Sequence, residues 1–173
     1  MSKVCKIILT LMGWQTNTTN LLNVKKSILI VYPHTSNWDF IIGILSAYAQ
    51  NIQIKFIIKK EWDIPLIGWV LKKMGAIFID RRKSTGLTKK IVALTQSLPC
   101  GHIVFTPEGT RKKVEKWKTG FYYTAIESKL PISLAYINYK QKTAGILEIF
   151  NPSGDYDTDL KIIKKQYITI LKK

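Results

Sequence analysis

Short apolar runs alternate with longer amphipathic segments along this chain. Runs at 28–31, 53–58, 76–80, 102–105, 131–139 and 145–150 are rich in Ile, Val and Phe, which is typical of buried strands. Segments at 38–50, 63–74, 84–98, 119–129 and 159–173 repeat apolar residues at helical spacing. This alternation predicts an α/β fold: a single domain, 1–173, with a largely parallel or mixed central sheet flanked by helices.

The amino-terminal segment, residues 3–14, predicts a further helix, followed by a polar connection or weak strand at 15–26. The helix is too short to span a bilayer and has no small-residue cleavage site, so we expect neither a transmembrane helix nor a signal peptide. Residues 1–14 could lie in the membrane interface or pack on the domain, and both alternatives stay open. Its apolar face consists of Val4, Ile7, Ile8, Leu11 and Met12.

The segment 63–74 has an apolar face whose place in the fold can be interpreted in two ways. We expect Asp63 as the N-cap of this helix and Gly75 as its stop. Core packing is the preferred interpretation. Tryptophans beside lysines also suit a membrane or acyl-chain surface. The residues concerned are Trp62, Leu66, Ile67, Trp69, Val70 and Met74, followed by Lys72 and Lys73.

Charge is the most unusual feature of the composition. The 173 residues carry a formal net charge of +16, which would draw the protein to anionic partners such as lipid headgroups or nucleic acid. Three of the 27 basic residues are arginines: Arg81, Arg82 and Arg111. The planar guanidinium group of arginine can donate two parallel hydrogen bonds to one phosphate group, so these three positions predict a phosphate ligand. Which of Arg81 and Arg82 faces the site is open.

Candidate chemistry begins at the end of the apolar run 28–31. His34 follows this predicted strand, and Asp39 falls in the first turn of the next helix, for which Asn37 is a suitable N-cap. A carboxylate that holds one imidazole nitrogen leaves the other free to take a proton, as catalytic bases require. A simple hydrogen-bonded turn is the alternative interpretation.

A second group of polar residues follows the predicted strand 103–105. Glu108, Gly109 and Arg111 come directly after it. Ligands of open α/β sheets bind at the carboxyl ends of strands, so the two strand ends predict one shared site.

These residues carry a family resemblance. His34–Asp39 resembles the H-x4-D block of glycerolipid acyltransferases of the 1-acylglycerol-3-phosphate acyltransferase type. Gly75–Arg81 resembles the second block of that family and Pro107–Arg111 the third. Leu130–Ala135 is similar to the fourth, although Leu134 stands where a second proline is usual.

The four blocks occur in the order of the family and span residues 28–137. The run Trp117–Phe121 and the short amino-terminal segment look like a short bacterial branch. The resemblance implies a glycerol-3-phosphate acyltransferase-like fold, with His34 as general base oriented by Asp39. It also implies that six residues bind the substrate: Arg81, Glu108, Gly109, Thr110, Arg111 and Lys118. Of these, Arg81 and Arg111 would bind the phosphate of the acceptor, assisted by Lys118.

The implied reaction moves a fatty acyl group from acyl-CoA or acyl carrier protein to the hydroxyl of a lysophospholipid such as 1-acylglycerol-3-phosphate. No nucleophile elbow is visible, so we expect direct transfer without a covalent intermediate. Two histidines far apart and two cysteines without metal spacing predict neither a metal nor another cofactor. We expect a cytoplasmic protein, peripherally associated with the cytoplasmic face of an anionic membrane.

Two alternatives remain. Water could replace the acceptor, which would make the protein a hydrolase of lysolipid esters or thioesters. A non-catalytic domain that binds membranes or nucleic acid through charge alone is the other. No signature of an RNA-binding module is present, so nucleic acid is not an expected partner.

Overall fold

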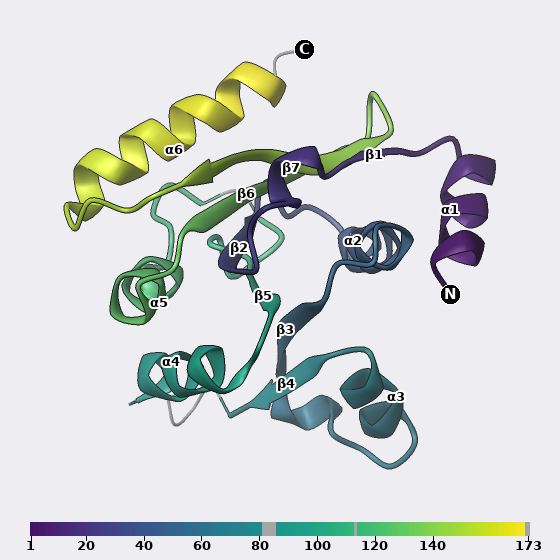
Figure 1. The fold of residues 1–173 in the computed structure, drawn as a ribbon, viewed down its shortest axis with the longest axis horizontal. Coiled ribbons are helices and arrows are strands. Elements are labelled where there is room, and N and C mark those ends of the chain that lie inside the picture. The colour runs from purple at the N-terminus through teal and green to yellow at the C-terminus, as the bar shows by residue number, and fades with distance from the viewer. Residues whose placement is uncertain (81–85, 113, 172–173) are drawn as a thin grey trace.

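The computed structural model describes residues 1–80, 86–112 and 114–171. Within these ranges, seven strands form one sheet in the order β1-β7-β6-β2-β5-β3-β4 (Figure 1). β6 and β7 pair antiparallel, whereas the other neighbouring strands run parallel. The predicted α/β fold with a mixed central sheet is confirmed. The strands are β1 (Gln15–Asn17), β2 (Lys26–Val31), β3 (Ile54–Lys59), β4 (Ala76–Ile79), β5 (Gly101–Phe105), β6 (Ile132–Asn138) and β7 (Thr143–Phe150).

Helices cover both faces of the sheet, α4, α5 and α6 on one side and α1, α2 and α3 on the other (Figure 1). The α-helices are α1 (Ser2–Leu11), α2 (Trp38–Ala49), α3 (Ile67–Lys73), α4 (Leu87–Ser97), α5 (Gly120–Ser128) and α6 (Tyr156–Leu171). Two short 3₁₀ helices, η1 (Thr19–Leu21) and η2 (Lys60–Trp62), complete the described elements.

β2 shows how the sheet divides the core. Its side chains alternate, so Ile28 and Ile30 enter the large cluster under α4, α5 and α6, while Leu29 and Val31 face the side of α2. Tyr167 of α6 anchors the first cluster, since its hydroxyl donates hydrogen bonds to the carbonyls of Ile30 and Ala135. The strand that precedes the candidate histidine is therefore held firmly on both faces.

The amino-terminal helix packs on the domain through one narrow side. Cys5 and Leu9 of α1 are buried with residues of α2, and Trp14 closes the same cluster. The opposite side of the helix remains exposed, and it carries four large apolar residues of the predicted face: Val4, Ile7, Ile8 and Leu11. The helix therefore packs on the domain and still presents an apolar surface.

The prediction for residues 63–74 is wrong in two respects. The helix begins at Ile67 with Leu66 before it, and Asp63 forms an ion pair with Lys72 at 2.7 Å instead of capping the helix. The apolar side chains expected in the core are also largely exposed, with Leu66 at 75% and Trp69 at 57%. The helix lies beside the edge strand β4, where no further layer of the described chain covers its outer side.

None of the described helices, which leave out residues 81–85, 113 and 172–173, is long and apolar enough to cross a membrane.

Candidate active site

The two strand ends predicted to share a site lie side by side. β2 and β5 are parallel neighbours, with Ile30 opposite Phe105 at their carboxyl ends. The loops that follow are tied together, because the backbone N–H of His34 donates a hydrogen bond to Glu108 Oε2 at 2.8 Å. Glu108 is buried, so its carboxylate holds the loop that carries His34 in a fixed position.

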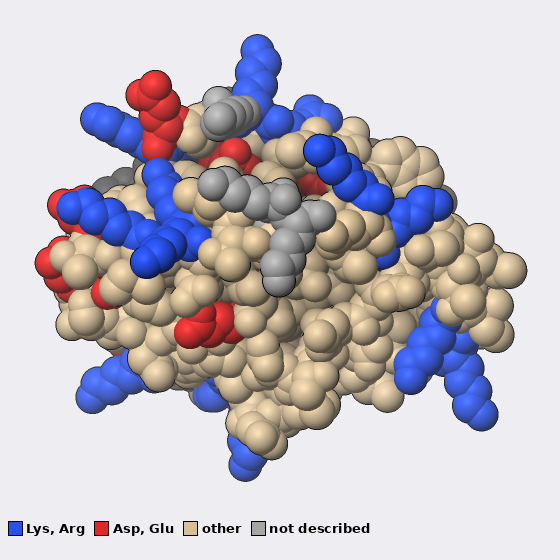
Figure 2. Space-filling model, turned by 90° about the horizontal axis from the view of Figure 1, so that it is seen from above, with Lys and Arg blue, Asp and Glu red and all other residues tan. Residues whose placement is uncertain are grey.

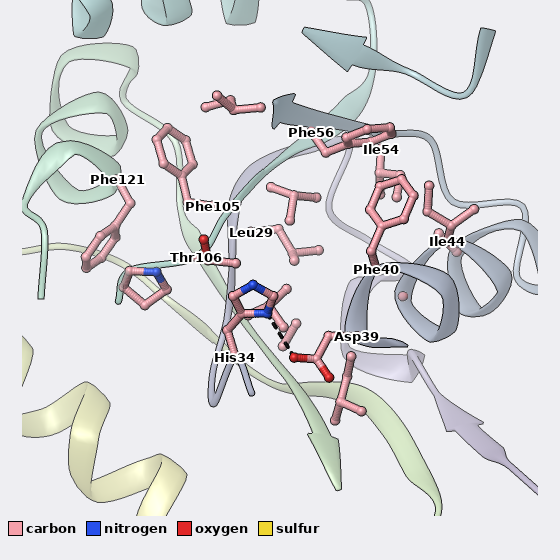
Figure 3. A pocket seen from close by; sticks show the side chains of 18 of the residues that line it. Leu29, His34, Asp39, Phe40, Ile44, Ile54, Phe56, Phe105, Thr106 and Phe121 are labelled. Atoms are coloured by element: carbon pink, nitrogen blue, oxygen red, sulfur yellow. Dashed lines mark hydrogen bonds and ion pairs between the residues drawn. The ribbon is translucent and has the colours of Figure 1, made fainter. Parts of the chain in front are cut away.

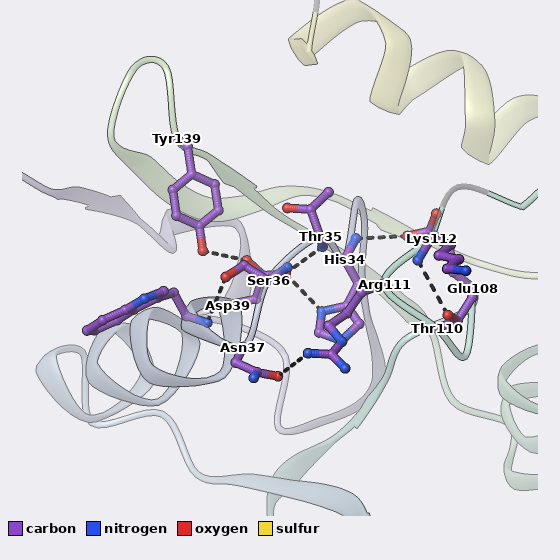
Figure 4. A network of polar contacts seen from close by, with 11 residues as sticks. His34, Thr35, Ser36, Asn37, Asp39, Glu108, Thr110, Arg111, Lys112 and Tyr139 are labelled. Carbon is purple, nitrogen blue, oxygen red and sulfur yellow. Dashed lines mark hydrogen bonds and ion pairs between the residues drawn. The ribbon is translucent and has the colours of Figure 1, made fainter.

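His34 and Asp39 meet across the corner between β2 and α2 (Figure 4). His34 Nδ1 lies 2.8 Å from Asp39 Oδ2, and the backbone N–H groups of Thr35 and Ser36 donate to the same oxygen at 2.8 and 3.0 Å. The hydroxyl of Tyr139, which follows β6, donates to Asp39 Oδ1 at 2.5 Å. Asp39 is thus held by four donors from two parts of the chain.

This set of donors determines the charge of Asp39. Burial acts to raise the pKa of the carboxyl, but the hydrogen bonds from His34, Tyr139 and the loop backbone outweigh it and lower the pKa. Asp39 is therefore a carboxylate, which can only accept, so the proton of the His34–Asp39 bond sits on Nδ1. Nε2 of His34 is left as the nitrogen that can take a proton.

The start of α2 uses its polar residues differently from the sequence-based expectation. The side chain of Asn37 was expected to cap the helix, but its Oδ1 accepts a hydrogen bond from Arg111 Nη1 at 2.9 Å. Ser36 Oγ accepts from the backbone N–H of Trp38 at 3.1 Å in its place. The hydrogen bond from Arg111 to Asn37 brings Arg111, which lies in the loop after β5, to the loop that carries His34.

Gly109 and Lys118 lie against each other in the loop after β5. Gly109 has a φ of +64°, and a Cβ there would come within 2.6 Å of Lys118 Cε. The glycine therefore makes room for the lysine side chain. Thr110 Oγ1 accepts a long bond from the N–H of Lys112 at 3.4 Å. Gly109, Thr110, Arg111 and Lys118 all line the cavity described next.

A cavity of about 820 Å³ opens beside His34 (Figure 3). It lies between α2 and the sheet, and its walls are mostly apolar. Its size is in the range of pockets that hold small organic ligands. Gly43 and Ala47 line the α2 side of the cavity, and their small side chains take up little of its space. The wall includes Leu29, Val31, Phe40, Ile44, Ile54, Phe56 and Val104.

Other predicted or possible site residues are placed elsewhere. Arg81 and Arg82 lie outside the described residues. His102 Nδ1 lies 2.8 Å from Ser27 Oγ, and Cys100 Sγ donates to Gln53 Oε1, so neither side chain is part of the His34 site. In the part of the chain that the structure describes, no three His, Cys, Asp or Glu side chains gather as metal ligands would.

Sequence reasoning missed Tyr139 as a site residue. It packs edge-on against Trp14, with ring centroids 5.3 Å apart, while its hydroxyl reaches Asp39. Burial, followed by the bond to Asp39, raises the pKa of Tyr139, so the phenol stays protonated and donates. The signal was available, because Tyr139 directly follows a parallel neighbour of β2 and so emerges at the same edge of the sheet.

Comparison with known proteins identifies the fold and the family of this chain. The crystal structure of the 1-acyl-sn-glycerophosphate (LPA) acyltransferase PlsC from Thermotoga maritima matches with a TM-score of 0.65 and 18% sequence identity, covering 99% of this chain and 75% of that one. At this identity the match shows a shared fold. No curated protein sequence matches the chain. The model of the family described as Acyltransferase matches residues 15–137, well over half of the sequence. The chain therefore belongs to the acyltransferase family of enzymes, as its four sequence blocks predict.

Proposed function

We propose that this enzyme transfers a fatty acyl group from a thioester donor, acyl-CoA or acyl carrier protein, to the hydroxyl of a lysophospholipid such as 1-acylglycerol-3-phosphate. The observation that carries the proposal is the His34–Asp39 pair in the lining of a mostly apolar cavity of about 820 Å³. The structural match supports it, because the protein of that structure is named for 1-acyl-sn-glycerophosphate.

The mechanism uses His34 as a general base. Nε2 takes the proton of the acceptor hydroxyl while the oxygen attacks the carbonyl carbon of the thioester. The tetrahedral intermediate collapses with cleavage of the C–S bond, and the imidazolium returns the proton to the leaving thiolate. Asp39 holds the ring in the required tautomer, and Tyr139 and the loop N–H groups hold Asp39.

The cavity is suited to an acyl chain. A hydrocarbon chain needs an apolar space, and the cavity between α2 and the sheet offers a mostly apolar one that includes His34 and Asp39 in its lining. Gly43 lines the cavity from the α2 side, and a Cβ at this position would meet no heavy atom within 4 Å. A larger side chain at this position would therefore extend into the cavity and narrow it.

Substitutions at Gly43 should therefore change the selectivity for chain length. Gly43→Phe is expected to lower kcat/KM for long-chain donors by roughly tenfold relative to short-chain donors, because the ring narrows the cavity. Gly43→Ala is the matched control, since it removes the same glycine but adds one methyl group. It should keep the donor preference and raise the melting temperature. Equal losses for all chain lengths in Gly43→Phe would place the chain elsewhere.

Arg111 is the described candidate for the acceptor phosphate, together with Arg81 outside the described residues. If Arg111 grips phosphate with two N–H groups, Arg111→Lys should raise the KM of the acceptor by roughly tenfold while the donor KM changes little. Lys112→Arg, at the next exposed position, should leave both constants unchanged. A lower melting temperature with an unchanged acceptor KM would show that the Asn37 contact is its whole role. The same measurement on Arg81→Lys and Arg82→Lys decides which of the two faces the site.

A screen of donors and acceptors with the purified protein tests the function itself. Mass spectrometry of the products should show a diacyl lipid that forms only when both substrates are present. Release of free fatty acid from donor or lysolipid at the same rate without an acceptor would make the enzyme a hydrolase. We also propose that the enzyme works at the cytoplasmic face of an anionic membrane, which its net charge of +16 and its lipid acceptor support.

A further inference from the structure

The segment from η2 to α3 carries an unusual concentration of exposed apolar side chains. Six large residues between positions 62 and 70 are exposed, among them two tryptophans. We call this set the α3 patch: Trp62, Ile64, Leu66, Ile67, Trp69 and Val70. Single exposed apolar residues are ordinary, but a continuous group in one short segment marks an interaction surface.

The patch is held out from the domain by a small set of contacts. α3 buries Gly68, whose missing Cβ would come within 2.6 Å of Asp63 Oδ1, so the helix rests closely on the turn before it. The ion pair between Lys72 and Asp63 at 2.7 Å fixes the same turn from the other end of the helix. Gly68 therefore faces the turn at Asp63, and Leu71 and Met74 are half-buried, while the large apolar residues of the patch stay exposed.

The charges around the patch indicate its partner. Lys59 and Lys60 precede it and Lys73 follows it, and all three are exposed. Lys72 is paired with Asp63, and Glu61 adds one negative charge, so the segment keeps an excess of positive charge. Lys73 Nζ lies 3.8 Å from the centre of the Trp69 ring, so the ammonium is carried next to an indole. Tryptophan and lysine together are typical of the interface between lipid headgroups and acyl chains, where the ring sits among the headgroups and the ammonium reaches anionic phosphate.

We infer that the α3 patch is a docking surface for an anionic lipid bilayer. This inference rests on the proposed function, since a lipid acceptor resides in such a bilayer. The patch is also next to the cavity: Ile58 and Lys59 of β3 line the cavity, and η2 begins at the next residue. Insertion of the tryptophans would thus bring the β3 side of the acyl-chain cavity to the membrane.

α1 offers a second apolar surface on the same side of the sheet (Figure 1). In the view of Figure 2, acidic side chains lie mostly toward the side of α6, away from the end that carries α1. Deleting residues 1–14 would remove the buried Cys5, Leu9 and Trp14 and so damage the core. Point substitutions are therefore the suitable way to compare the two surfaces.

The test measures binding to vesicles of 70% phosphatidylcholine and 30% phosphatidylglycerol by sedimentation. Leu66→Ser/Trp69→Ser is expected to weaken binding by roughly tenfold or more, because binding follows the apolar area that is inserted. Ile162→Ser/Ile168→Ser on α6 is the matched control, since these residues are 43% and 51% exposed and lie on the other side of the sheet. The control should bind as the wild type does, and pure phosphatidylcholine vesicles should bind the wild type less.

Three results would overturn the inference. Loss of binding in Ile7→Ser/Leu11→Ser with wild-type binding in Leu66→Ser/Trp69→Ser would assign docking to α1 alone. A wild-type dimer that Leu66→Ser/Trp69→Ser converts to a monomer, with vesicle binding unchanged, would make the α3 patch an interface between copies of this chain. If Ile162→Ser/Ile168→Ser weakened vesicle binding as much as Leu66→Ser/Trp69→Ser does, binding would be nonspecific. Melting curves of each variant confirm that the exposed substitutions leave the fold intact.

Activity on water-soluble short-chain substrates separates this inference from the proposed function. The α3 variants should turn over such substrates at the wild-type rate, because the patch lies outside the catalytic corner. A wild-type protein that binds vesicles through the patch but transfers no acyl group would refute the proposed function and leave the docking surface standing.

Discussion

His34→Ala is expected to lower kcat by roughly 10²–10⁴-fold, which is the usual cost of losing a positioned general base. The side chain of His34 is the one group in the described cavity wall whose free nitrogen is set up to take a proton, with Nδ1 committed to Asp39 at 2.8 Å. Without it, the acceptor hydroxyl must lose its proton to water. What remains is the advantage of holding donor and acceptor together.

The fold should tolerate this change. The His34 side chain is 22% exposed, and the loop is anchored by backbone contacts that alanine keeps, including the N–H bond to Glu108. The melting temperature of His34→Ala should therefore stay close to that of the wild type. Asp39→Asn should cost somewhat less activity than His34→Ala, because the base remains while its orientation is weakened. Undiminished turnover in a folded His34→Ala protein would remove His34 from the mechanism.

The second large effect concerns the stability of the fold in acid. His102 is buried in the sheet, where Ser133 donates a hydrogen bond to Ser27 and Ser27 lies 2.8 Å from His102 Nδ1. Burial lowers the pKa of His102 from 6.5 to about 4. The free energy of unfolding should therefore fall by about 3 kcal/mol as the pH drops from about 7 to about 4.

The direction follows from which state binds the proton. Between pH 6.5 and about 4, His102 is protonated in the unfolded chain and neutral in the folded one. The unfolded state binds more protons in this window, so stability rises with pH and is lost on acidification. The lowered pKa of Asp39 acts below this window, since its contribution is lost as the pH falls below the ordinary value of 3.8.

Urea unfolding at a series of pH values measures this effect. His102→Gln removes the buried titrating group, and its stability should change much less between pH 7 and about 4 than that of the wild type. His34→Gln is the matched control, because it removes the other of the two histidines, which is partly exposed. The control should keep the steep dependence on pH. Equal slopes for all three proteins would show that His102 is not the source.

The sequence by itself determined the order of the elements and the contact between His34 and Asp39. The short β-branched apolar run 28–31 favours a buried strand, and the longer apolar run after Asn37 favours a helix, so both elements were evident before any contact was known. His34 and Asp39 are five residues apart across one strand end, so their contact is also nearly local. The shared site with Glu108 followed from a rule about parallel strands, and the pairing of β2 with β5 satisfies it.

Tertiary structure alone decided which side chains are buried and which distant residues contact one another. The apolar stripe of α3 looks the same in sequence whether a sheet or solvent lies next to it, and the position of α3 beside the edge strand β4 left the stripe exposed. The reach of Tyr139 to Asp39 spans 100 residues, and it depends on the order of strands in the sheet. The cavity is lined by residues of α2, including Gly43 and Ala47, together with residues of five strands. These features depend on packing between distant segments, which residue spacing along the chain does not specify.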